Sequence, residues 1–389
     1  MSQKNFAITP SVSISRSKFR RPSQHKTSFN LGAIVPIYVD ADILPGDTVS
    51  LDLASLIRMS TPMAPLMDNI FVDYYAFFVP NRLVWKNWKK FMGENTVSYG
   101  AATEPTMPYE NIQNLSKGKL GDYFGLPVGL ARDELADDSL NVSALPSRAY
   151  ALIYNEWFRD QNLIAPVVIP DGDGSAGSYE YGDGNTGIHN DLFIAAKESD
   201  YFTRCLPYAQ KGSPVSLPLG GNAPLTLGEG YKLHQPTGAP DYEAPSIFDS
   251  VDLISGDTAP VVEIATDSSV PTYSTLYADL SKVTAATINQ LRFAFQYQKF
   301  LEKDALYGTR YWEILKGHFG ITAPDASLQR PELLGHFRQH INIDQVLQTS
   351  ESGVTPLGNP GANSVSGKSD HLISKSFVEH GILIMSSNS

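Results

Sequence analysis

Short runs of β-forming residues separated by long connections constrain the fold of this chain more than any other feature. The strongest run, 69–79, is dense in β-branched and aromatic residues and ends at Pro80. Val49, Leu51 and Leu53 alternate with polar residues, as in a half-buried strand. Because no regular strand–helix–strand repeat follows, the pattern predicts an antiparallel β-sandwich or jelly roll with insertions. Further β-like runs lie at 34–39 and from 333 onward.

Four segments have the apolar spacing of helices. In the longest of them, Ile288, Leu291, Phe295 and Leu301 recur at helical intervals, and aromatic residues flank them. Apolar side chains therefore cover much of its circumference, which predicts a helix buried on more than one side. The four predicted helices span 81–92, 146–162, 284–306 and 309–316.

Two long segments, 171–187 and 212–280, are dominated by Gly, Pro, Ser, Thr and Asp. Insertions of this kind lie on surfaces and often carry recognition. The first segment is no phosphate loop, because no Gly-Lys-Ser/Thr follows it. As a calcium loop starting at Asp171 it has Ala176 in place of the required Gly and Gly182 in place of the bidentate Glu. A flexible acidic loop is the favoured interpretation.

The residues needed for catalysis or metal binding do not cluster in the sequence. Of eight dispersed histidines, only His336 and His340 lie four residues apart, in a segment of β-like composition rather than on a helix. The single cysteine, Cys205, excludes an internal disulfide and is more typical of a small buried residue than of a nucleophile. We therefore predict no catalytic residue, no cofactor and no metal site.

The charges divide the chain into a basic arm and an acidic body. Residues 1–39 carry six basic residues and no acid, whereas the other 24 basic and all 41 acidic residues lie beyond them, a balance of −17. A positive arm on a negative body suggests a polyanion such as single-stranded DNA as partner of the arm alone. A solvated, disordered tail is the alternative, and composition does not decide between them. The candidate nucleic-acid-binding residues are Arg16, Lys18, Phe19, Arg20, Arg21 and Lys26.

No apolar stretch in the sequence has the length of a membrane-spanning helix, and the first thirty residues lack the apolar core of a signal peptide. We therefore expect a soluble, unexported chain without membrane insertion.

Several strings, in order along the chain, resemble the major capsid protein of gokushoviruses, which are Microviridae bacteriophages with circular single-stranded DNA. The resemblance covers about 15–384. It implies a mainly β fold, an eight-stranded antiparallel viral jelly roll with long helical and loop insertions, and a structural rather than enzymatic role. The strings include Leu44-Pro-Gly-Asp, Met63-Ala-Pro-Leu-Met-Asp-Asn, Phe77-Phe-Val-Pro-Asn-Arg-Leu-Val-Trp, Tyr154-Asn-Glu-Trp-Phe-Arg-Asp-Gln-Asn-Leu and Lys375-Ser-Phe-Val-Glu-His-Gly.

The resemblance also implies partners and a place of action. Sixty copies would form a T=1 icosahedral shell around the packaged single-stranded DNA, with a small internal DNA-binding protein as a further partner. Assembly would occur in the cytoplasm of the bacterial host, and the product would be the virion. A host surface receptor would be met by the projecting insertion near the threefold axes.

The domain organisation expected from the resemblance has three parts. They are the basic arm 1–26, a jelly-roll body formed by 27–212 and 281–389, and a surface-projecting insertion, 213–280. Two departures from the family pattern affect this expectation: Gly335-His-Phe-Arg-Gln-His replaces a Gly-rich turn, and the chain stops well over a hundred residues earlier than its relatives. We therefore expect terminal strands to be missing, a sheet edge to be unpaired and the chain alone to assemble poorly.

One alternative function is a carbohydrate-binding or hydrolytic β-sandwich. Its site would use paired acids such as Asp171 and Asp173, or Asp137 and Asp138. Neighbouring acids in the sequence do not establish two carboxylates that oppose each other across a cleft, which glycoside hydrolysis requires. The capsid interpretation is therefore preferred.

Overall fold

The computed structural model divides the chain into two compact units, 1–205 with 310–389, and 206–309. Cys205, Asp137, Asp138 and most of the two long insertions lie outside the residues that the structure describes. The three-part organisation inferred from the sequence stays a prediction. The described residues are 13–60, 68–94, 104–112, 117–128, 140–174, 191–198, 200, 208–216, 225–227, 276–278 and 287–389.

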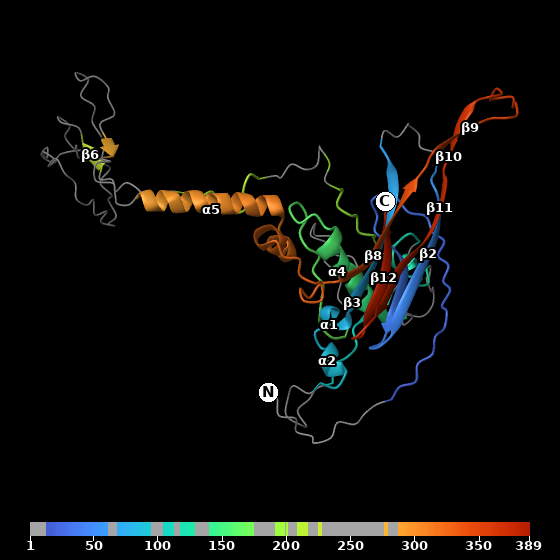
Figure 1. Ribbon diagram of the computed structural model, residues 1–389, viewed down its shortest axis with the longest axis horizontal. Coiled ribbons are helices and arrows are strands. Elements are labelled where there is room, and N and C mark those ends of the chain that lie inside the picture. The colour runs from blue at the N-terminus through green and yellow to red at the C-terminus, as the bar shows by residue number, and fades with distance from the viewer. Residues whose placement is uncertain are drawn as a thin grey trace, which may run out of the picture. The chain divides into compact units, whose positions relative to one another are not determined.

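A four-stranded antiparallel sheet forms the centre of the larger unit, in the order β1-β12-β3-β8 (Figure 1). Its strands are β1 (Val35–Ile43), β12 (Gly381–Asn388), β3 (Ile70–Pro80) and β8 (Glu332–Ile341). The apolar runs of β3 and β12 bury nearly every side chain, as in strands covered on both faces. β1 and β12, which are more than 300 residues apart in the sequence, are neighbours in this sheet.

A second sheet covers one face of the first. It pairs β2 (Thr48–Arg58) with β11 (Val365–Ser376) in antiparallel register. Between the two sheets, Phe78 and Leu383 pack in one apolar cluster with Ile373 and Phe377. The result is a β-sandwich, and it confirms the predicted mainly β, jelly-roll class. Six strands of the described residues lie in the two facing sheets, so the count of eight remains a prediction.

Helices cover the other face of the four-stranded sheet. Phe77 and Ile384 of the sheet pack against Trp85, Tyr150 and Tyr154 in the largest apolar cluster. The helix predicted at 146–162 is confirmed. The helical elements of this layer are α1 (Asn81–Val84), α2 (Trp88–Phe91), α4 (Leu145–Ile153) and the π-helical turn η1 (Tyr154–Phe158).

The prediction of one continuous helix at 81–92 is wrong. The backbone turns to an extended conformation at Trp85, between α1 and α2. The Trp85 ring is completely buried, and its Nε1 donates a hydrogen bond to Asp173 at 2.6 Å. Because burial of this large side chain and its polar atom requires a change of direction, packing overrides the helical pattern.

The predicted long helix is confirmed as α5 (Ile288–Tyr307), which begins with a capping box between Thr287 and Gln290. Its predicted burial on more than one side is wrong, since Ala305 is its only buried residue. The helix predicted at 309–316 is formed by α6 (Tyr311–Ile314) and η3 (Leu315–Phe319). The remaining elements are α3 (Leu120–Tyr123) and the antiparallel pairs β4 (Tyr109–Ile112) with β5 (Leu140–Ser143), β6 (Leu225–Leu227) with β7 (Leu276–Ala278), and β9 (Asp344–Leu347) with β10 (Pro360–Asn363).

The last strand of the chain lies in the interior of the sheet, not at its edge. β12 pairs with β1 on one side and with β3 on the other. The unpaired edge expected from missing terminal strands is therefore not found at β12. Within the described ranges, no helix is both long and apolar enough to cross a membrane.

Candidate nucleic-acid interface

The arm is anchored to the body by Arg21. Its Nη1 lies 2.7 Å from Oδ2 of Asp40, a carboxylate that is almost completely buried on β1. The Tyr38 hydroxyl and the Asp42 backbone N–H also donate to this carboxylate, at 3.3 and 3.2 Å. A buried carboxylate is stable only with such partners, so Arg21 contributes its charge to the anchor rather than to solvent.

A second contact involves Arg16 and the turn between β1 and β2. Gly46 has a φ of +90° in this turn, and its N–H donates to the Phe377 carbonyl at 2.6 Å. The Arg16 guanidinium occupies the space beside the glycine: a Cβ added at Gly46 would lie 2.0 Å from Arg16 Nη2. The left-handed backbone is what requires glycine here, since the end of the Arg16 side chain could shift away from a Cβ.

Between these two contacts the arm presents a short basic and aromatic segment to solvent. Lys18, Phe19 and Arg20 are all exposed, and the Phe19 side chain is 74% exposed. Lys26 is also exposed. Within the described part of the chain, Lys18, Arg20 and Lys26 form no ion pair. Exposed cations beside an accessible aromatic ring can bind phosphates and stack on a base.

The end of the arm contacts the body near α3. The Tyr123 hydroxyl donates to the Ser28 carbonyl at 2.7 Å. Partial burial lowers the pKa of His25, and the nearby Asp122 carboxylate only partly opposes this effect. His25 is therefore neutral at pH 7 and adds no charge to the arm.

The structure divides the six predicted residues into two groups. Arg16 and Arg21 contact the body, whereas Lys18, Phe19, Arg20 and Lys26 point into solvent. The sequence interpretation missed the anchors on the body. A signal for one of them was present, because Asp40 is the first acidic residue of the chain, but its burial beside Arg21 depends on tertiary packing.

Of the acids considered for a hydrolytic site, Asp171 and Asp173 are engaged in contacts within the body, and Asp137 and Asp138 lie outside the described residues. Asp173 accepts hydrogen bonds from Trp85 and, at 2.9 Å, from Asn87, and Asp171 forms an ion pair with Lys86 at 3.3 Å. Burial alone would raise the pKa of Asp173, but the hydrogen bonds from Asn87 and Trp85, together with the nearby charges of Lys86 and Lys90, outweigh it and lower that pKa. Among the residues that the structure covers, no group of three or more His, Cys, Asp or Glu could hold a metal ion.

His336 belongs to a network around a buried carboxylate. On β3, the Asp73 side chain accepts two hydrogen bonds from Arg338 of β8, at 2.7 and 2.6 Å, and lies 3.1 Å from His336 Nε2. Its third neighbour is the Tyr75 hydroxyl, at 3.3 Å. Burial raises the pKa of Tyr75, and the Asp73 carboxylate adds to this effect, so the phenol stays protonated and donates.

His340 also has a packing contact, because its ring meets Phe71 edge to face. Both histidines therefore make contacts with residues of the neighbouring strand β3. The Gly335-His-Phe-Arg-Gln-His string is part of β8. A Cβ at Gly335 would lie 2.6 Å from the Leu372 carbonyl oxygen, so this glycine allows β8 to approach β11 closely.

Comparison with known proteins identifies the family. The capsid protein (F protein) family matches residues 7–387. Capsid protein VP1 of Bdellovibrio phage phiMH2K is 40% identical over 400 residues, which cover 98% of this chain and 70% of the relative. The corresponding proteins of Spiroplasma virus 4 and Chlamydia phage 1 are 37% and 33% identical, over 98% and 97% of this chain and 70% and 72% of the relatives. The chain therefore belongs to the capsid protein (F protein) family and is a major capsid protein of the Microviridae, the small single-stranded DNA phages.

Proposed function

We propose that sixty copies of the chain form a T=1 shell, with the arm contacting the packaged single-stranded DNA. Capsid proteins of this family assemble into multi-copy shells and have a structural role. The observation that carries the DNA contact is the exposed Lys18-Phe19-Arg20 segment, held between the contacts of Arg16 and Arg21. The body carries a balance of −17, so its net charge opposes DNA binding, whereas the arm carries only positive charge.

The ion pair between Arg21 and Asp40 predicts a specific effect of Asp40→Asn on DNA binding. The amide keeps the shape of the carboxylate but releases the Arg21 charge. With Arg16, Lys18, Arg20 and Lys26 available, log K for single-stranded DNA should fall against log salt with a slope of about −3, and Arg21 should steepen it to about −3.5. Fluorescence anisotropy with the full chain and a labelled oligonucleotide measures both slopes.

Asp42→Asn is the matched control for this prediction. It removes the same charge two residues away from an exposed carboxylate that does not pair with Arg21. We expect this variant to keep the wild-type slope. Equal slopes for Asp40→Asn and Asp42→Asn would contradict the anchor, and binding that does not depend on salt would contradict the DNA contact itself.

We further propose that the insertion 213–280 meets the receptor on the host surface. The antiparallel pair β6–β7 supports this proposal, because it joins Leu227 to Leu276 and so brings the ends of the intervening segment together. A segment that leaves and returns at one point can vary without disturbing the elements that hold it.

Replacement of 228–275 by a short Gly-Ser linker should therefore preserve particle formation and reduce adsorption to host cells by at least about tenfold. Electron microscopy measures the first quantity and phage adsorption the second, with unmodified particles as control. Unchanged adsorption by intact particles would contradict the role in attachment. The other proposed features are assembly in the host cytoplasm, residence in the virion and a small internal DNA-binding protein as partner.

A further inference from the structure

The longest helix of the described chain exposes most of its apolar side chains. Ile288, Phe295 and Leu306 of α5 are 68%, 65% and 74% exposed. Large apolar residues grouped on one element in this way are typical of a surface that another molecule covers.

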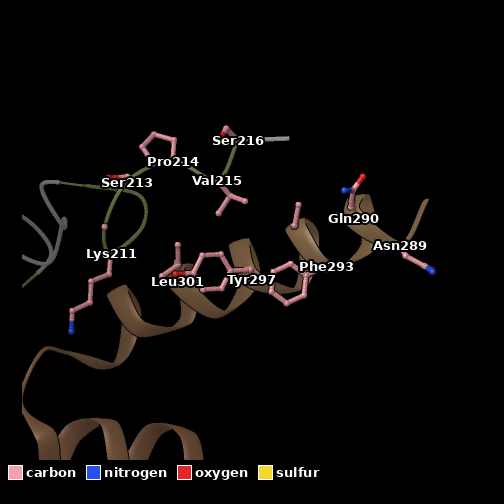
Figure 2. A pocket seen from close by; sticks show the side chains of 12 residues that line it. Lys211, Ser213, Pro214, Val215, Ser216, Asn289, Gln290, Phe293, Tyr297 and Leu301 are labelled. Atoms are coloured by element: carbon pink, nitrogen blue, oxygen red, sulfur yellow. The ribbon is translucent and has the colours of Figure 1, made fainter. Parts of the chain in front are cut away.

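Among the described residues of its unit, 210–216 lie against one face of α5. The Lys211 N–H donates to the Leu301 carbonyl at 3.2 Å, and Gln298 is hydrogen-bonded to Gln210. Above this contact lies an open groove of about 800 Å³ between 211–216 and the helix, lined by Val215, Phe293 and Tyr297 among others (Figure 2). Ile288, Phe295 and Leu306 do not line this groove, and lie roughly half a turn away from the packed face.

A stripe of six residues runs along the side of α5 that faces away from 210–216. Its residues are spaced by four, three, four, three and four positions, the spacing of the contact positions in a coiled coil. The stripe is about 27 Å long. Its residues, in order, are Ile288, Arg292, Phe295, Lys299, Glu302 and Leu306.

The order of these residues is self-complementary when read in opposite directions. Antiparallel alignment of two copies places Ile288 opposite Leu306, Arg292 opposite Glu302 and Phe295 opposite Lys299, and each pair occurs twice. The three pairs are an apolar contact, an ion pair and a cation–π contact. Parallel alignment would instead place each charged residue opposite itself, so like charges would repel.

We propose that α5 pairs with α5 of a second copy of this chain, antiparallel, through this stripe. Such a contact is isologous and has twofold symmetry. The proposal rests on the proposed T=1 shell, because an icosahedral shell contains twofold axes between subunits. The stripe is available for it: Arg292, Lys299 and Glu302 are exposed, and none of them forms an ion pair with another described residue, although Glu302 accepts a hydrogen bond from Gln298 at 2.9 Å.

Cysteine cross-linking tests the contact and its direction. In a Cys205→Ser background, one full-length chain carries Ile288→Cys and another carries Leu306→Cys. The proposal predicts a disulfide-linked dimer when the two chains are mixed and mildly oxidised, and none with either chain alone. Dimers of a single variant would indicate parallel pairing and overturn the proposal, as would the absence of dimers from the mixture.

Electron microscopy of the same samples separates this proposal from the proposed function. Particles without cross-links would overturn the α5 contact and leave the shell proposal standing. Cross-linked dimers without particles would support the contact and contradict the shell.

A charge exchange provides a second test that does not depend on cysteines. Arg292→Glu should place two glutamates opposite each other and lower the yield of cross-linked dimer by about tenfold. The double variant Arg292→Glu with Glu302→Arg restores opposite charges in the antiparallel pair and should recover most of that yield. It contains the same destabilising substitution, so it is the matched control for folding. Failure of the double variant to recover the dimer, with normal circular dichroism, would overturn the proposed pairing.

Discussion

Replacing Asp73 with alanine should lower the free energy of unfolding by about 3 kcal/mol. The variant removes a buried carboxylate and leaves the Arg338 guanidinium, His336 and the Tyr75 hydroxyl without their common acceptor. The cost stays below that of a fully buried pair, because Arg338 is partly exposed and retains its contact with Glu198 at 2.6 Å. Chemical denaturation followed by circular dichroism measures the change.

Asp52→Ala is the control for this prediction. Asp52 on β2 also pairs with a histidine on a neighbouring strand, His371 on β11, at 2.6 Å. The side chain of Asp52 is 72% exposed, however, whereas that of Asp73 is 4% exposed. Water and salt screen an exposed pair, so its loss should cost less than about 1 kcal/mol. Similar losses for both variants would show that burial of Asp73 does not determine the strength of this network.

Strands β2 and β3 were predictable because burial of a strand's faces leaves a local pattern in its sequence. The apolar and aromatic run at 69–79 corresponds to β3, and the alternation of Val49, Leu51 and Leu53 corresponds to β2. Each pattern depends only on which faces of a strand are buried. Burial on one face produces alternation, and burial on both faces produces a continuous apolar run.

Features that depend on contacts between distant residues could not be predicted in the same way. The helical pattern at 81–92 contains no signal for the break at Trp85, because the partner of its indole N–H, Asp173, lies 88 residues further along the chain. The Asp73 network likewise needs the register that places Asp73 opposite Arg338.

The wide apolar surface of α5 is a case in which the pattern was correct and the inferred environment was wrong. Periodicity shows which side chains need cover, but not whether the cover comes from the same chain. In the arm, the basic residues identified the candidate interface. Asp40, the buried acid that holds Arg21, was identified only by the structure.

Phe77→Ala should be at least as destabilising as Asp73→Ala, with a loss of about 3–5 kcal/mol. Phe77 is completely buried where the four-stranded sheet meets the helical layer. Its ring centroid lies 5.5 Å from that of Trp157 and 5.9 Å from that of Phe158. Because both rings belong to η1, they cannot move into the space without separating the helices from the sheet, so the variant leaves a cavity.

Phe295→Ala removes the same ring from an exposed position on α5, and in the isolated subunit it should cost less than about 0.5 kcal/mol. The two variants therefore distinguish two kinds of apolar residue that look alike in the sequence: one that holds the layers of a subunit together and one available for contact with another copy. Thermal unfolding of each variant measures the first property, and the yield of the Ile288–Leu306 cross-link measures the second. Phe77→Ala should lower the melting temperature, whereas Phe295→Ala should mainly reduce the cross-link. A large loss of subunit stability in Phe295→Ala would indicate that the subunit itself covers this side of α5.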